Sequence, residues 1–514
     1  MAPRAWRRRH QSGGTELVTQ GGATGQTATV WRSGLAVVLL ALAQVLVVFD
    51  TTAFAVGIPL IVRDWQLSFN GLTWLLSTYS VCFAALPVLA VALGKAFGQR
   101  RVLMAGLVLS IASATAPAVA SDARVLLASR AAQGIAAAAI TSGALALIES
   151  THPEGPGRAR ALNVHFAVVA CAAPAVVLPC SVLLSTTSTE RALFWVQAAA
   201  GAVLLLLTPL ALTESEPARA SRARVGGAAL AVVPLGFLAW FADWLGGRSV
   251  SSTTVIVVAV AGALVPSTLG WFGRGEGVPA LLARLYRERA AFGAYTVVTL
   301  LAAGLAGVLF VLTLALQVIG GLSVIRIGWA LLPAVAGVVL GCLVLPPLAA
   351  RAGLGATVAG ASTVAATGFV LLSVQSADLH FADALLPLLL IAFGCGVLAL
   401  PTTFARPGSD ALPQGLNASR QLGAGLGGSL FVGIVTVTQQ RMPATTLPGL
   451  KDYRNFLVPG VRACFELGAA LGLTAAVVAL LTLPGRGVRG TASDPGVSGG
   501  APAGTTGSPG SSGP

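Results

Sequence analysis

The sequence predicts an all-helical membrane protein that crosses the bilayer fourteen times. Its 514 residues are 55% hydrophobic and only 10% charged, whereas a soluble domain carries about 25% charged residues. The apolar residues gather in fourteen continuous runs, and a helix that spans the hydrocarbon core needs roughly 20 mostly apolar residues. Because backbone groups in lipid must be hydrogen-bonded within the segment, such runs indicate transmembrane helices.

The expected spans follow one another from Leu35 to Leu483. They cover residues 35–61, 72–93, 102–120, 125–148, 162–184, 192–212, 226–245, 253–272, 291–316, 328–348, 354–374, 384–404, 416–438 and 462–483. If the seventh and eighth runs did not cross, the chain would have twelve spans and one long central loop. Both runs are apolar over about 20 residues, which favours crossing.

The two ends of the chain have a different composition. Residues 1–33 are polar with an arginine cluster, and residues 485–514 are rich in Gly, Ser, Pro and Thr. Neither segment can bury a hydrophobic core, so we expect two disordered tails. The first 30 residues contain no apolar run and are therefore not a cleavable signal peptide.

Basic residues beside the spans predict the orientation of the chain. An even number of spans puts both termini on one side. The tails and loops of that side hold 21 basic residues, against nine on the other. This bias predicts a multi-pass protein of the cytoplasmic membrane with both termini in the cytoplasm. The net charge of +14 is then a topology signal, so we expect the lipid bilayer as a partner and no nucleic acid.

Several kinds of site are missing from the sequence. The six cysteines form no CxxC pair and the four histidines no HExxH spacing, so neither a metal site nor a disulfide framework is predicted. Gly94 and Lys95 are followed by Ala96, whereas a phosphate-binding loop needs Ser or Thr there. We expect no cofactor, no nucleotide and no enzymatic activity.

Charged residues inside the spans are few, and each is a functional candidate because its burial in lipid is costly. Asp50 lies in the first span, Arg130 near the start of the fourth, and Arg420 just inside the thirteenth. Asp50 could carry a transported proton, or it could be a structural residue bonded to the next helix. Arg130 could respond to that proton, or it could form a structural ion pair.

Helical spacing places further polar and small residues beside the two arginines. The face of Arg130 also carries Gln133, Gly134 and Thr141, which predicts that it points to an interior cavity. Asn417 and Gln421 share the face of Arg420. Because this second group lies at a span end, its side chains could instead reach the lipid headgroups.

The residues around these sites resemble the fourteen-span branch of drug:proton antiporters in the major facilitator superfamily. Phe49–Thr52 followed by Pro59 is similar to the branch's LDxTIVNVALP motif, and WLLSTYS, with Trp74 and Tyr79, to its second span. RAAQG from Arg130 is similar to RxxQG. LPQGLNASRQLG from Leu412 resembles the start of the thirteenth span. The resemblance covers roughly residues 35–483.

The resemblance implies two six-helix bundles joined through two extra spans. The bundles would occupy residues 34–213 and 275–484, with residues 214–274 as the linker. It also implies a monomer that exports small amphipathic molecules by alternating access, driven by inward proton flow. Asp50 and Arg130 would couple the proton. The substrate cavity would be lined by Tyr79, Gln133, Gly134, Thr141, Asn417, Arg420 and Gln421.

Two segments depart from the family pattern. The loop after the second span normally reads GxLADRxGRR, and this chain reads VALGKAFGQR followed by Arg101. Gly98 and Arg100 are retained, but Lys95 replaces an aspartate, so we expect a gating loop of Lys95, Gly98, Arg100 and Arg101 with altered contacts. The GPxxGG motif of the fifth span keeps its proline and has Val177 and Leu178 for the glycines. An uncoupled facilitator or importer, or a non-transporting scaffold or receptor-like derivative, therefore remains as an alternative.

Overall fold

The regular structure of the chain is helical wherever it is described. The computed structural model describes residues 21–67, 69–152, 155–214, 289–375, 380–399, 412–440 and 450–485. The first part of the chain contains α1 (Gly21–Asp64), α2 (Phe69–Ala85), α3 (Pro87–Phe97), α4 (Gln99–Val119), α5 (Ala123–Thr151), α6 (Pro156–Thr187) and α7 (Arg191–Ala211). The second part contains α11 (Arg289–Val318), α12 (Val324–Ala330), α13 (Leu332–Ala352), α14 (Leu354–Gln375), α15 (Phe381–Cys395), the 3-10 helix η1 (Gly396–Ala399), α17 (Leu412–Gln440) and α18 (Leu450–Thr482).

Each expected span that falls within these ranges coincides with one or two helices. Nine of the described helical segments are long and apolar enough to cross a membrane. The expected spans 226–245 and 253–272 lie outside the described residues, so the number fourteen stays a prediction.

Several boundaries differ from the sequence-based expectation. The second expected span is divided between α2 and α3 at Leu86, and the tenth between α12 and α13 at Leu331. Pro87 and Pro333 lie within two residues after these breaks. Proline lacks the backbone N–H that would continue the helix, which explains why the helix is interrupted there. In addition, α1 already begins at Gly21, so residues 21–33 are helical and not a disordered tail; extending a formed helix needs no new nucleus.

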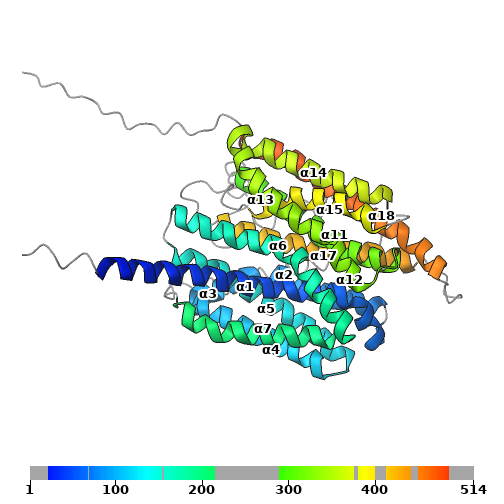
Figure 1. Cartoon of the computed structure of the whole chain (residues 1–514), viewed down its shortest axis with the longest axis horizontal. Helices are drawn as coiled ribbons and strands as arrows, with labels where there is room; N and C mark the ends of the chain where they lie inside the picture. Colours follow the sequence, from blue (N-terminus) through cyan, green and yellow to red (C-terminus); the bar gives the residue numbers. More distant parts are fainter. Residues whose placement is uncertain are drawn as a thin grey trace, which may run out of the picture.

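The helices form two groups that lie side by side in Figure 1. Contacts among α1, α4, α5, α6 and α7 build one group, and contacts among α11, α14, α15, α17 and α18 build the other. The two groups meet where α2 packs on α17 and where α6 packs on α12 and α13. Three pairs of helices thus carry most of the contact between the groups.

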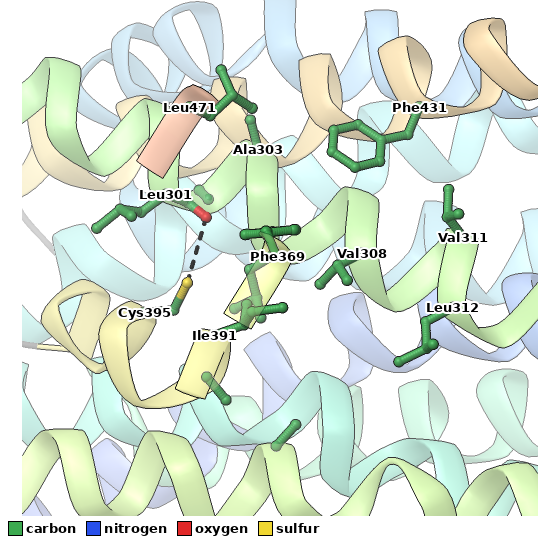
Figure 2. Packing of buried hydrophobic residues seen from close by; sticks show 14 of the residues in the cluster. Leu301, Ala303, Val308, Val311, Leu312, Phe369, Ile391, Cys395, Phe431 and Leu471 are labelled. Atoms are coloured by element: carbon green, nitrogen blue, oxygen red, sulfur yellow. Dashed lines mark hydrogen bonds between the residues drawn. The ribbon is translucent and has the colours of Figure 1, made fainter. Parts of the chain in front are cut away.

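Small residues set the spacing of helices in the second group. A Cβ atom on Gly423 would lie 2.2 Å from the carbonyl oxygen of Thr299, and one on Gly427 would lie 2.2 Å from that of Ala303. Helix α17 therefore packs directly on the backbone of α11, as small residues allow in membrane helices. Figure 2 shows the apolar core beside this contact, with Phe431 near α11 and the Cys395 thiol 3.7 Å from the carbonyl oxygen of Leu301.

The outward faces of the helices are apolar. Leu210 of α7 is 84% exposed, and Leu481 of α18 is 72% exposed. Large apolar side chains also stand exposed on α4, α13 and α14. A water-soluble monomer seldom exposes extended apolar surface, so these faces fit a lipid environment.

Candidate functional site

A buried ion pair joins α1 and α5 inside the first helix group. The Nη1 atom of Arg130 donates a hydrogen bond of 3.2 Å to Oδ1 of Asp50. The side chains are only 2% and 5% exposed, respectively. The two charged residues that the sequence singles out at the N-terminal end therefore meet each other, although 80 residues separate them.

Arg130 is also held by uncharged neighbours. Its Nη1 donates to Oε1 of Gln133 at 2.8 Å. The centroids of the Phe54 and Tyr79 rings lie 4.2 and 4.3 Å from its guanidinium carbon. An aromatic face attracts a cation, and more strongly where water is excluded. The charge of Arg130 thus has favourable contacts that do not depend on Asp50.

Gln197 of α7 completes the network, and sequence reasoning did not find it. Its side chain lies close enough to Asp50 to interact with the carboxyl group, and its Oε1 accepts a bond of 3.5 Å from Nε2 of Gln133. The available signal was a single glutamine in the apolar run 192–212. An isolated amide in a span is common enough that only the fold reveals its partners.

The remaining residues on the Arg130 face lie in tightly packed surroundings. A Cβ atom on Gly134 would lie 2.6 Å from the carbonyl oxygen of Tyr79, so this glycine allows α5 to approach α2. Thr141 is fully buried, and its hydroxyl has no hydrogen-bond partner among the described residues. Tyr79 is likewise buried, and its hydroxyl is unpartnered there.

A second polar cluster lies on α17 in the other helix group. The Nη2 atom of Arg420 donates to Oδ1 of Asn417 at 3.1 Å. Its guanidinium carbon lies 5.5 Å from the centroid of the Phe166 ring, which belongs to α6. Gln421 is buried with both amide atoms unpartnered among the described residues. The cluster is therefore inside the protein and reaches across to the first group.

His165 joins this cluster, although no sequence motif marks it as a candidate. It lies in α6 with a 1% exposed side chain, and it is close enough to Arg420 to interact electrostatically. Its ring meets Phe166 edge to face, with 5.5 Å between the centroids. The only signal was a histidine in the apolar run 162–184.

The loop between α3 and α4 is closed by an acid from a distant segment. Oε1 of Glu214, which follows α7, accepts a bond of 3.0 Å from the backbone N–H of Arg100. The Glu214 carboxylate also pairs with Nε of Arg100 at 3.8 Å and of Arg101 at 3.7 Å. Lys95 is exposed. A carboxylate therefore binds the two arginines in the first turn of α4 although position 95 carries a lysine.

Gly98 is suited to this closure. Its φ angle is +106°, a region that residues with a side chain rarely adopt. A Cβ atom at this position would also lie 2.5 Å from Oε1 of Glu214. Both observations indicate that the retained glycine lets the acid approach the loop backbone.

The contact between α6 and α12 remains close without the expected glycines of α6. A Cβ atom on Gly328 of α12 would lie 3.0 Å from Cα of Leu178 and 3.1 Å from Cβ of Ser181. The small residue that permits this approach is thus on the opposite helix. Leu178 occupies the contact because its neighbour has no side chain.

Comparisons with known proteins agree with this fold. The family model described as the Major Facilitator Superfamily matches residues 40–431. A solved structure concerned with substrate recognition in proton-dependent oligopeptide transporters has a TM-score of 0.57 and 15% sequence identity. It covers 88% of this chain and 98% of that chain. This likeness supports the fold alone.

Curated relatives cover most of the chain. The puromycin resistance protein of Streptomyces alboniger is 30% identical, over 77% of this chain and 80% of its own length. The methylenomycin A resistance protein of Bacillus subtilis is 28% identical, over 77% and 86%. The cephamycin export protein of Amycolatopsis lactamdurans is 28% identical, over 79% and 85%.

Proposed function

Since this chain belongs to the Major Facilitator Superfamily and is a multi-pass membrane transporter, we propose that it exports small amphipathic molecules, including antibiotics, in exchange for protons. The names of its relatives supply the substrate class, because they are resistance and export proteins. The observation that carries the proton coupling is the buried ion pair between Asp50 and Arg130.

In this ion pair, Asp50 is the group that binds the proton, and binding breaks its pairing with Arg130. In an outward-open state, Asp50 takes up a proton and its charge is neutralised. The ion pair with Arg130 is then lost, but Arg130 keeps its contacts with Gln133, Phe54 and Tyr79. Without these contacts, breaking a buried pair would leave an uncompensated charge. After the halves close and reopen inward, Asp50 releases the proton and substrate enters.

We also propose how the chain lies in the membrane. The chain crosses the cytoplasmic membrane fourteen times with both termini in the cytoplasm. Its two bundles comprise residues 34–213 and 275–484, and residues 214–274 form the linker. The basic residues of the tails and loops support this orientation. The substrate and protons are its partners, and the monomer is the transporting unit.

Proton coupling can be tested with Asp50→Asn in inverted membrane vesicles from an efflux-deficient host. In vesicles that are acidic inside, we expect wild-type protein to accumulate labelled puromycin, and Asp50→Asn to lose this accumulation while still exchanging labelled for unlabelled drug. The matched control is Glu466→Gln, because Glu466 is a 55% exposed acid on α18. It should behave as wild type.

The alternatives give different results in the same vesicles. Full proton-driven accumulation by Asp50→Asn would contradict the assigned role of Asp50. Wild-type flux that ignores the pH gradient would identify an uncoupled facilitator. Absence of flux across a drug panel led by puromycin would favour a non-transporting derivative.

A further inference from the structure

The polar cluster of α6 and α17 carries positive charge without a matching acid. Arg420 is half-buried, and among the described residues its side chain donates a hydrogen bond to Asn417. Its Nε atom has no partner, and no carboxylate of the described residues forms an ion pair with it. A buried donor without an acceptor destabilises the protein, so this arrangement calls for a functional explanation.

His165 also lacks hydrogen-bond partners among the described residues. Both of its ring nitrogens are buried. In either neutral tautomer, one nitrogen carries an N–H that can donate. Arg420 and His165 thus offer donors to the same small region, while Phe166 lies beside both side chains.

We propose that Arg420 and His165, supported by Asn417, bind the anionic group of an amphipathic substrate. A carboxylate or sulfonate accepts several hydrogen bonds and pairs strongly with a guanidinium group. The ring of Phe166 provides an aromatic surface next to that charge. The assignment rests on the proposed transport function and adds acidic amphipathic molecules to its substrate class.

The position of the cluster links the ligand to the two helix groups. His165 belongs to α6, which packs on α12 and α13, and Arg420 belongs to α17, which packs on α2. An anion held between α6 and α17 therefore contacts both groups at once. The Asp50 site does not require an anionic ligand, because Arg130 is already paired with the Asp50 carboxylate.

Two probes with the same aromatic skeleton test the proposal. 8-Anilino-1-naphthalenesulfonate is anionic, and N-phenyl-1-naphthylamine is its neutral counterpart without the sulfonate. We expect Arg420→Gln, in phosphatidylcholine nanodiscs, to bind the anionic probe about ten- to a hundredfold more weakly than wild type. Affinity for the neutral probe should stay within about twofold, and Arg420→Lys should be intermediate.

The control is Arg462→Gln, which removes a 62% exposed arginine from α18. It should leave both affinities unchanged. Equal binding of the anionic probe by wild type and Arg420→Gln would overturn the proposal. If Arg420→Gln does not fold, competition on wild type decides, because 1-naphthalenesulfonate should displace the anionic probe and neutral 1-naphthalenemethanol should not. Equal displacement by both compounds would also overturn it.

An anionic lipid headgroup has the same chemistry as an acidic substrate. Nanodiscs containing phosphatidylglycerol distinguish the two, because a lipid that occupies the site would abolish the difference between wild type and Arg420→Gln. That result would overturn the substrate assignment, whereas a persistent difference supports it. These measurements are made at equilibrium without a gradient, so they stand whether or not Asp50→Asn loses proton-driven transport.

Discussion

Arg130 and Arg420 are the same residue type inside the same membrane protein, but their electrostatic surroundings are opposite. Arg130 has an acid at 3.2 Å, an amide partner and two aromatic rings. Arg420 has one amide and one ring. Both arginines have a buried Nε atom without a hydrogen-bond partner among the described residues, but only Arg130 is paired with a carboxylate there. The comparison separates a residue that responds to a proton from one that responds to a charged molecule.

Stability provides the largest expected difference between the two arginines. Replacing Arg130 with Leu leaves Asp50 charged and buried, which should lower the free energy of unfolding by about 3–5 kcal/mol. Arg420→Leu removes an unpaired charge and should change stability by about 1 kcal/mol or less in either direction. Thermal and denaturant unfolding of both purified variants in one detergent would measure the difference.

A double variant sharpens this test. Asp50→Asn combined with Arg130→Leu removes both charges, so it should recover part of the stability that Arg130→Leu loses. If Arg130→Leu and Arg420→Leu were equally destabilising, the electrostatic distinction between the two clusters would be wrong.

The aromatic contacts of Arg130 provide an intermediate effect. Tyr79→Leu removes one ring face from a desolvated guanidinium and should cost about 2 kcal/mol. Tyr79→Phe keeps the ring and deletes a hydroxyl that has no partner among the described residues, so it should be close to neutral. A double-mutant cycle with Arg130→Leu measures how much of the loss belongs to the cation–ring contact. A coupling near zero would show that Tyr79 acts through packing alone.

The positions of the helices were predictable, and their contacts were not. The bilayer demands long apolar segments, so each apolar run in the described ranges coincides with helix, although α1 and α18 begin well before their expected spans. Breaks depend on local detail, as at Pro87. Which helices touch depends on small residues such as Gly427 and Gly328, whose partners lie far away in the sequence.

The candidate site was predictable where charge is rare. Asp50 and Arg130 stand out because few ionisable residues occur inside the spans. Gln197, His165 and Glu214 gave only weak signals, since their roles come from partners on other helices. The family motif has an aspartate where this chain has Lys95, but only the fold shows that Glu214 provides a carboxylate for the neighbouring arginines.

Arg100 and Arg101, at the start of α4, are paired like Arg130 but lie near the surface, so they should give the smallest effect. Glu214→Gln removes the charge that holds Arg100 and Arg101, which should cost about 1 kcal/mol because exposed pairs are weak. The loop should also open more often, and trypsin should cleave after these arginines faster than in wild type. The matched control is Lys95→Gln, which should leave cleavage there unchanged because Lys95 is exposed. If Lys95→Gln accelerated cleavage as much as Glu214→Gln, the lysine would be part of the closure.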